Sequence, residues 1–158
     1  FNLKGPVTSA MTSVKIFTRI ESPQEILEQT TPRGNYLYKR YLRVNKAYEE
    51  LYKIGLDCVK EDDPLILYVY HHDQYSLSGE LANELKWRNK DKAVIIARSH
   101  DGKMIMSLRG EEKEVHGPLQ KALEGLDGYG GGHPKACGAV VAEEQFDEFI
   151  EKFRKAIE

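Results

Sequence analysis

The feature that most limits the possible fold of this chain is a pair of apolar runs. Between the two runs lies a segment whose apolar residues have the spacing of a helix. Leu65–Tyr70 is apolar throughout, and Ala93–Arg98 is apolar up to its last residue; such runs are typical of strands buried on both faces of a sheet. Between them, Leu77, Leu81 and Leu85 recur every fourth residue, as on one face of a helix. This order predicts a βαβ unit with parallel strands and a right-handed crossover.

The residues that follow extend this unit into a mixed sheet. Asp101-Gly102 is a hairpin turn signal, so residues 103–109 should return antiparallel to the second strand. Residues 115–126 are expected to be helical, and residues 137–141 form a further apolar strand. We therefore predict an α/β fold for residues 64–158, a mixed β-sheet with helices packed on it. Its last helix should bury one stripe of side chains: Phe146, Phe149, Ile150, Phe153 and Ile157.

Residues 1–63 are expected to form a separate N-terminal segment that ends in a long connecting helix. Alternation of Val14, Ile16 and Thr18 with other side chains predicts a short strand, and a short helix is expected between Pro23 and Thr31. The long helix is predicted from about residue 35 to 59. Its apolar face has alternating spacings of four and three: Leu37, Tyr41, Val44, Tyr48 and Leu51.

The other sides of this long helix are basic, with Lys39, Arg40, Arg43 and Lys46. A solvated surface is the ordinary explanation for such a charge pattern. The alternative is that the basic side faces a partner domain or a strand of nucleic acid.

Composition excludes several functional classes. The formal net charge of −2 excludes a globally basic protein, so any binding of nucleic acid must depend on a local cluster. The longest apolar run is far below the roughly 18 residues of a membrane span, so we expect no membrane partner. Cys58 and Cys137 lack metal-ligand spacing, which favours reduced thiols and a cytoplasmic setting.

The stretch GYGGGHPKACGAVV, residues 128–141, has five glycines around a histidine, a proline and a lysine. Glycine is used where the backbone needs positive φ or must be approached closely. We expect a glycine loop that leads into the strand at 137–141. Its backbone N–H groups could bind an anion, and His133 could add a donor or a charge. A tight turn with a surface histidine is the alternative without a binding role.

Period-two alternation along residues 103–109 places Ser107 and Arg109 on the same face of their strand. The guanidinium of arginine is a rigid fork of donors that matches phosphate, and a serine adds one more hydrogen bond. Both side chains emerge at the end of the strand, directly before Gly110. They are candidate phosphate ligands, although an arginine at the end of a strand is often an ordinary surface residue.

The segments SGELANEL, AVIIAR, SLRG and GYGGGHPKACGA together resemble the DHHA1 domain, the second domain of the DHH-family phosphoesterases. The resemblance covers residues 64–158, and the whole chain is most similar to archaeal RecJ-like single-strand exonucleases. It implies that the glycine block and the strand arginine bind the phosphates or terminal nucleotide of the substrate. In this chain the resemblance assigns these roles to Gly130, Gly131, Gly132, His133, Ser107 and Arg109. Arg98 is a further candidate.

The chain departs from this family in its catalytic residues. Catalysis in the family resembles two-metal phosphoester hydrolysis, with Mn or Mg held by Asp and His side chains of the DHH domain. This chain has no Asp-His-His string, only the reversed His71-His72-Asp73. Adjacent residues on an extended chain point opposite ways, so these three cannot converge on one ion without a bend. We expect no catalytic residue, metal or cofactor here, and a catalytic DHH domain in a longer protein of which this chain, beginning at Phe1, is a part.

The resemblance thus implies that this chain is the substrate-binding part of a two-domain exonuclease or phosphoesterase, not catalytic in isolation. Its expected ligand is single-stranded DNA, RNA or a short oligonucleotide, held through phosphates. The alternative is a protein-interaction module whose tyrosine-rich helix docks a DNA-replication protein. A complete small enzyme that uses the reversed histidine motif ranks last.

Overall fold

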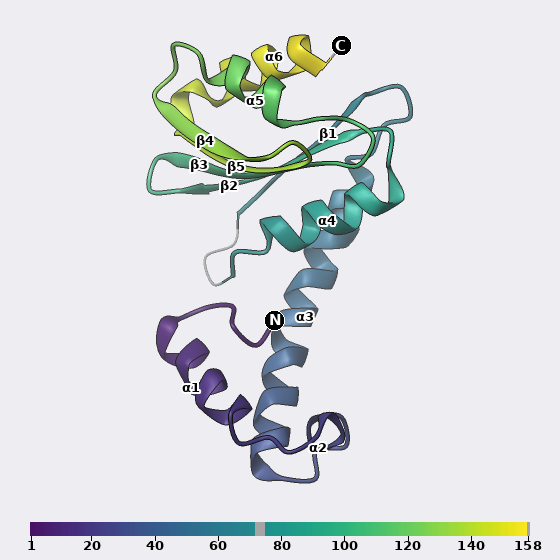
Figure 1. Cartoon of the computed structure of the whole chain (residues 1–158), viewed down its shortest axis with the longest axis vertical. Helices are drawn as coiled ribbons and strands as arrows, with labels where there is room; N and C mark the ends of the chain where they lie inside the picture. The colour runs from purple at the N-terminus through teal and green to yellow at the C-terminus, as the bar shows by residue number, and fades with distance from the viewer. Residues whose placement is uncertain (72–74, 158) are drawn as a thin grey trace. The chain divides into compact units, whose positions relative to one another are not determined.

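The computed structural model describes residues 1–71 and 75–157, and its chain divides into two compact units (Figure 1). One unit comprises Phe1–Leu51 with His72–Ser76, and the other comprises Tyr52–His71 with Leu77–Glu158. We call them the helical unit and the sheet unit. Among the helices of the described ranges, none combines the length and the apolar character that a bilayer crossing requires.

The helical unit contains α1 (Val7–Phe17), α2 (Pro23–Leu27) and α3 (Pro32–Asp57) up to Leu51. The strand predicted around residues 14–18 is wrong, because this segment is the end of α1. Its apolar residues Val7, Met11, Val14 and Phe17 are spaced by four, three and three, a helical period that the short window around Val14 did not include.

The long connecting helix is confirmed as α3, and its apolar stripe is buried at Leu37, Val44 and Leu51. Its basic side is not uniformly solvated, because Arg40 is only 6% exposed. The guanidinium of Arg40 donates hydrogen bonds to the backbone carbonyls of Asn2 (3.0 Å) and Lys4. Arg40 is therefore a structural residue that fastens the first residues of the chain to α3.

The sheet unit is built on five strands in the order β1-β2-β3-β5-β4. β1 and β2 are parallel with α4 as their crossover, and the other neighbours are antiparallel, as the predicted mixed sheet requires. The strands are β1 (Leu65–Tyr70), β2 (Ala93–His100), β3 (Lys103–Gly110), β4 (Gly128–His133) and β5 (Ala136–Ala142). The helices are α4 (Ser78–Arg88), α5 (His116–Leu123) and α6 (Phe146–Ile157), with a 3-10 turn at Glu143–Gln145.

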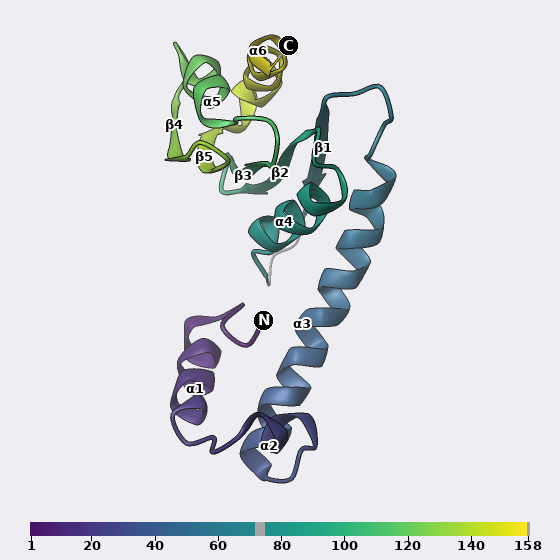
Figure 2. The same ribbon diagram turned by 45° about the vertical axis from the view of Figure 1, so that its right-hand side comes forward.

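Helices cover the two faces of this sheet unequally. α5 and α6 lie on one face, over a buried cluster that includes Met104, Met106 and Leu108 of β3 (Figure 1). All five predicted side chains of α6 are buried. On the other face, α4 packs over β2 and β3, and it leaves the outer strands β5 and β4 uncovered, where Gly138 and His133 are exposed (Figure 2).

The glycine segment is a strand, which corrects the predicted loop. Residues 128–133 form β4, paired antiparallel with β5 along its whole length. Three consecutive glycines disfavour a strand on propensity alone, so the pairing with β5 decides the conformation. β4 lies at the edge of the sheet, where several of its residues are exposed.

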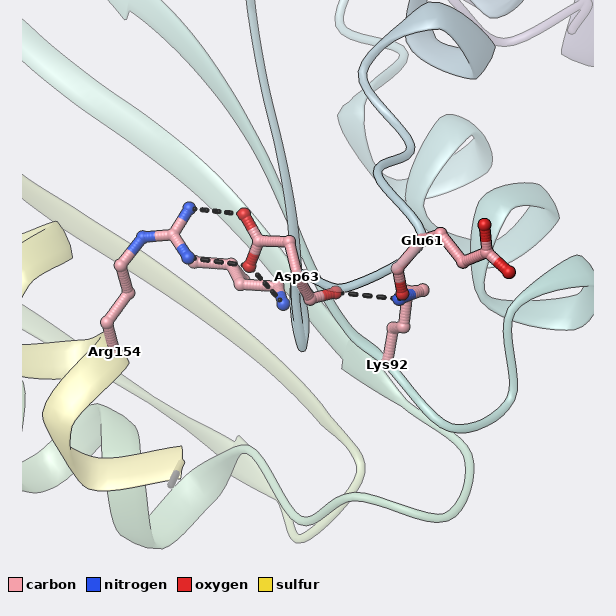
Figure 3. Close-up of polar contacts among 5 residues, drawn as sticks. Glu61, Asp63, Lys92 and Arg154 are labelled. Atoms are coloured by element: carbon pink, nitrogen blue, oxygen red, sulfur yellow. Dashed lines mark hydrogen bonds and ion pairs between the residues drawn. The ribbon is translucent and has the colours of Figure 1, made fainter.

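A network of charged groups fixes the segment between α3 and β1 to the rest of the sheet unit (Figure 3). The carboxylate of Asp63 accepts two hydrogen bonds from the guanidinium of Arg154 on α6, at 2.6 and 3.0 Å, and one from the N–H of Leu65. The ammonium of Lys92, 7% exposed, donates to the carbonyls of Glu61 and Asp63 at 2.7 Å each. The start of β1 is therefore held by the side chain of Arg154 on α6 and by that of Lys92, directly before β2.

Arg154→Ala is expected to lower the free energy of unfolding by about 1–2 kcal/mol, because two hydrogen bonds to a carboxylate are lost from a pair that is partly exposed. The hydrogen bond from Arg154 is the main reason that the pKa of Asp63 is lowered. A carboxyl with a lowered folded-state pKa stabilises the fold above its unfolded pKa and loses this contribution as the pH falls through its folded pKa.

Denaturant unfolding at neutral pH and at about pH 3, near the ordinary pKa of aspartate, measures this effect. The difference in the free energy of unfolding between the wild type and Arg154→Ala should be smaller at the acid pH. Lys155→Ala, an exposed cation on the same helix, should change the stability by less than about 0.5 kcal/mol at both. A difference for Arg154→Ala that does not change with pH would contradict the role of the pair.

Candidate phosphate-binding site

Strand pairing brings most of the predicted site residues onto one face of the sheet. In an antiparallel ladder, directly opposed residues have side chains on the same face. Ser107 of β3 is opposite Gly138 of β5, which is opposite Gly131 of β4. Two residues along, Arg109 is opposite Ala136, and Ala136 is opposite His133. We call Ser107, Arg109, Gly131, His133 and Gly138 the phosphate patch.

Two glycines side by side make the middle of this patch flat. Nothing lies within 4 Å of a Cβ built on Gly131, and the nearest atom to a Cβ on Gly138 is a backbone oxygen at 3.8 Å. A ligand can therefore approach the backbone of both strands closely. Gly138 was not among the predicted site residues, although its place opposite the predicted Ser107 follows from correct pairing of the two strands.

Arg109 is held in place by neutral acceptors. Its Nε donates to Oδ1 of Asn83 at 2.9 Å, and Nη1 donates to the carbonyls of Leu108 (2.8 Å) and Cys137 (3.0 Å). Within the described part of the chain, Nη2 makes no hydrogen bond, and no carboxylate pairs with this guanidinium. Arg109 is thus positioned in advance, with its charge uncompensated and two N–H donors left for a ligand.

The start of α4 closes one side of the patch. A Cβ built on Gly79 would lie 3.8 Å from Nη2 of Arg109 and 3.9 Å from Oγ of Ser107. The buried hydroxyl of Tyr70 fixes this turn, because it accepts from the N–H of Leu77 at 2.9 Å and lies 3.0 Å from Oγ of Ser78. The N-terminus of α4, the positive end of its dipole, is thereby kept beside Ser107 and Arg109. Sequence reasoning missed Gly79 and Asn83, which have no motif of their own.

The other two glycines of the triplet have a different role from Gly131. A Cβ on Gly130 would lie 2.8 Å from that of Ala139, and one on Gly132 would lie 2.4 Å from the carbonyl oxygen of Ala136. Gly132 also has φ of +145°. Both positions exclude side chains because the backbone of β5 is too close.

Their backbone nonetheless faces the open edge of the sheet. The carbonyl of Gly130 accepts from Nε2 of Gln120, so it points away from β5. In an antiparallel pair, residues alternate between bonding to the partner strand and pointing away from it, N–H and C=O together. The N–H groups of Gly130 and Gly132 are therefore directed to the outer edge of β4, next to the patch.

Arg98 shares this face of the sheet but stands apart from Arg109. It is opposite Ile105, which is four residues before Arg109 on β3. At about 3.3 Å per residue, the two positions are some 13 Å apart along the strands. The structure therefore groups Ser107, Arg109, Gly131 and His133, and it does not place Arg98 with them. Whether any of these residues binds substrate stays a prediction.

The reversed histidine motif falls mainly outside the described residues, because His72 and Asp73 lie in the gap between 71 and 75. Within the described ranges, no group of three or more His, Cys, Asp or Glu side chains is arranged to hold a metal ion. Cys58 and Cys137 are free thiols, and burial is the main cause that raises the pKa of each.

Comparison with solved structures shows that several other proteins share this fold. RecJ in complex with Mn²⁺ from Thermus thermophilus is 15% identical, with a TM-score of 0.71 over 94% of this chain and 22% of its own. The pGpG-specific phosphodiesterase PggH from Vibrio is 17% identical, with a TM-score of 0.59 over 96% and 51%. The C-Ala domain of alanyl-tRNA synthetase from Aquifex aeolicus is 20% identical, with a TM-score of 0.52 over 59% and 89%. This chain thus spans under a quarter of RecJ and about half of PggH.

The fold defines a small α/β domain, a five-stranded mixed sheet with helices packed on it. The model of the DHHA1 domain family matches residues 65–158, and the chain belongs to that family. The predicted α/β fold with a long preceding helix is confirmed. No curated protein matches the chain. The predicted domain boundary between residues 63 and 64 stays a prediction.

Proposed function

We propose that this chain binds the phosphate backbone of single-stranded nucleic acid as the substrate-binding part of a RecJ-like DHH-family exonuclease or phosphoesterase. The observation that carries the proposal is the state of Arg109, fixed by three neutral acceptors and left with Nη2 beside Gly79 at the start of α4. A guanidinium matches the oxygens of a phosphate, and it is weakly hydrated compared with an ammonium.

The other members of the patch suit the same ligand. Ser107 lies beside Arg109 at the N-terminus of α4, a position that favours anions. His133 is exposed and lies on the same row of the sheet as Arg109. Gly131 and Gly138 let a phosphate approach without a steric barrier. Contacts of this kind go to phosphates and not to base edges, so we expect little sequence preference.

Catalysis in this proposal belongs to a DHH domain that uses Mn or Mg, outside this chain. A reduced, cytoplasmic setting, which two free thiols favour, is part of the proposal.

Docking of a replication protein through α3 has less support than phosphate binding. The apolar stripe of α3, which would form the docking surface, is largely packed within the helical unit. Leu37 and Val44 are fully buried, and the ring of Phe1 packs on Tyr41 and Tyr48 with centroids 5.9 and 5.3 Å apart.

Arg109→Ala and His133→Ala are each expected to weaken the binding of a short 5′-phosphorylated single strand about tenfold or more, because each removes a hydrogen bond to a charged group. Lys46 is an exposed cation on α3, and Lys46→Ala should weaken binding only about twofold, since salt screens diffuse charge. Arg109→Lys should restore only part of the affinity, because lysine lacks the fork of donors.

Fluorescence anisotropy at two salt concentrations measures these affinities, with thermal melts to confirm that each variant folds. Binding through phosphates should weaken steeply with salt. Equal losses for Arg109→Ala and Lys46→Ala would indicate a diffuse basic surface in place of the patch. Full affinity in Arg109→Ala would refute the proposal.

A further inference from the structure

The exposed side of α4 has an aromatic side chain that the phosphate patch does not use. Trp87 is 59% exposed and is the one tryptophan in the sequence. A single exposed aromatic residue needs no explanation by itself. The ring of Trp87, however, has two cations beside it, with Nζ of Lys86 4.9 Å and Nζ of Lys90 5.7 Å from its centroid.

Trp87 is linked to the phosphate patch through Asn83 on α4. Asn83 accepts from Arg109, and Trp87 follows it at i+4, one turn further on the same side of the helix. Four residues of helix correspond to about 6 Å along its axis. This is close to two steps of a stacked strand, at about 3.4 Å per nucleotide.

Lysines gather around a carboxylate next to this aromatic side chain. Lys86 pairs with Glu111, just after β3, at 2.8 Å. The pKa of Glu111 is lowered first by the hydrogen bond from Lys86 and further by the charges of Lys135 and Lys90. Three lysines from α4, the loop after it and the turn between β4 and β5 thus lie around one carboxylate. Glu112 is also near, because its backbone N–H donates to the carbonyl of Lys90 at 3.0 Å.

We propose that Trp87, with Lys86, Lys90 and Lys135, forms a second subsite where an unpaired base of a single strand stacks on the indole and flanking phosphates contact the lysines. This inference rests on the proposed function, since the same oligonucleotide binds Arg109 through one of its phosphates. An aromatic side chain combined with cations is the usual platform for single-stranded nucleic acid, because every base has a face to stack. A base paired within a duplex does not expose that face.

The position of the subsite predicts a dependence on oligonucleotide length. With its 5′-phosphate on Arg109, a dinucleotide supplies one nucleotide step and falls short of the roughly two that separate Asn83 from Trp87, whereas an octanucleotide covers both sites. Trp87→Ala should weaken octanucleotide binding roughly tenfold and leave dinucleotide binding unchanged. Trp87→Phe should recover most of the loss because phenylalanine keeps a face for stacking. Arg109→Ala should weaken the binding of both ligands.

Tryptophan fluorescence provides a direct readout, since Trp87 is the one source of this signal. The octanucleotide should quench the emission on binding, and the dinucleotide should not. Lys90→Ala should weaken octanucleotide binding several-fold, whereas Lys155→Ala, an exposed lysine on α6, should have no effect. Thermal melts should change little, because none of these three side chains is buried.

Two results would overturn the inference and leave the proposed function intact, provided that Arg109→Ala still weakens binding. One is octanucleotide binding without quenching and with full affinity in Trp87→Ala. The other is equal quenching by the dinucleotide, which would place stacking at the phosphate patch itself. No binding of either oligonucleotide to the wild type would refute both the inference and the proposed function.

Discussion

Gly132→Ala is expected to lower the free energy of unfolding by about 3 kcal/mol or more, the largest loss of stability that we expect from one added methyl group in the glycine block. Gly132 has φ of +145°, which side chains of L-residues rarely adopt. A Cβ there would also lie 2.4 Å from the carbonyl oxygen of Ala136 and 2.9 Å from Cα of Cys137. Both obstacles are backbone atoms, so a change of rotamer cannot relieve them.

The matched control is Gly131→Ala, one residue earlier on the same strand. Gly131 has no such φ, and its Cβ position is open. Alanine there should be neutral or should stabilise the fold by up to about 1 kcal/mol, because it restricts the unfolded chain. Urea unfolding of both variants measures the contrast, and equal stabilities for the two would contradict the pairing of β4 with β5.

Gly131→Val is expected to reduce binding of a 5′-phosphorylated single strand about a hundredfold, or roughly 3 kcal/mol, while the protein stays folded. Its side chain would stand on the flat middle of the phosphate patch, beside Gly138, where the phosphate must approach. A β-branched residue suits the extended backbone of a strand, so the thermal melt should change little.

Anisotropy and thermal melts of the same samples check both halves of this prediction. Ile105→Val, on the same face of β3 but outside the patch, is the control and should retain binding. Full affinity in Gly131→Val would show that the ligand does not touch the glycines. Unfolding of Gly131→Val would contradict the open space found beside this residue.

Secondary structure in the sheet unit was predictable because its signals are local and strong. The apolar runs of β1 and β2, the Asp101-Gly102 turn and the stripe of α6 each determine one element from its own residues. The strand expected around Val14 failed because a few residues can match period two by chance within a helix. β4 was missed because its glycines give no strand signal, and its conformation comes from a partner strand further along the chain.

The candidate site was predictable only in part, for a similar reason. Ser107 and Arg109 share a face by period two, and His133 joins them through pairing that the sequence does not specify. Gly79, Asn83 and Gly138 belong to the site by contacts across the fold, with no motif of their own. Arg40 is the opposite case. The charge pattern of α3 placed it on a solvated basic side, whereas the first residues of the chain bury it.

The most direct test of phosphate binding at the patch is a map of backbone amide shifts by NMR as a 5′-phosphorylated single strand is added. The proposed function predicts that the largest changes fall on Ser107, Arg109, Gly131, His133 and Gly138, with the start of α4 next. Changes confined to α3 or α6, with these amides unmoved at saturation, would contradict it.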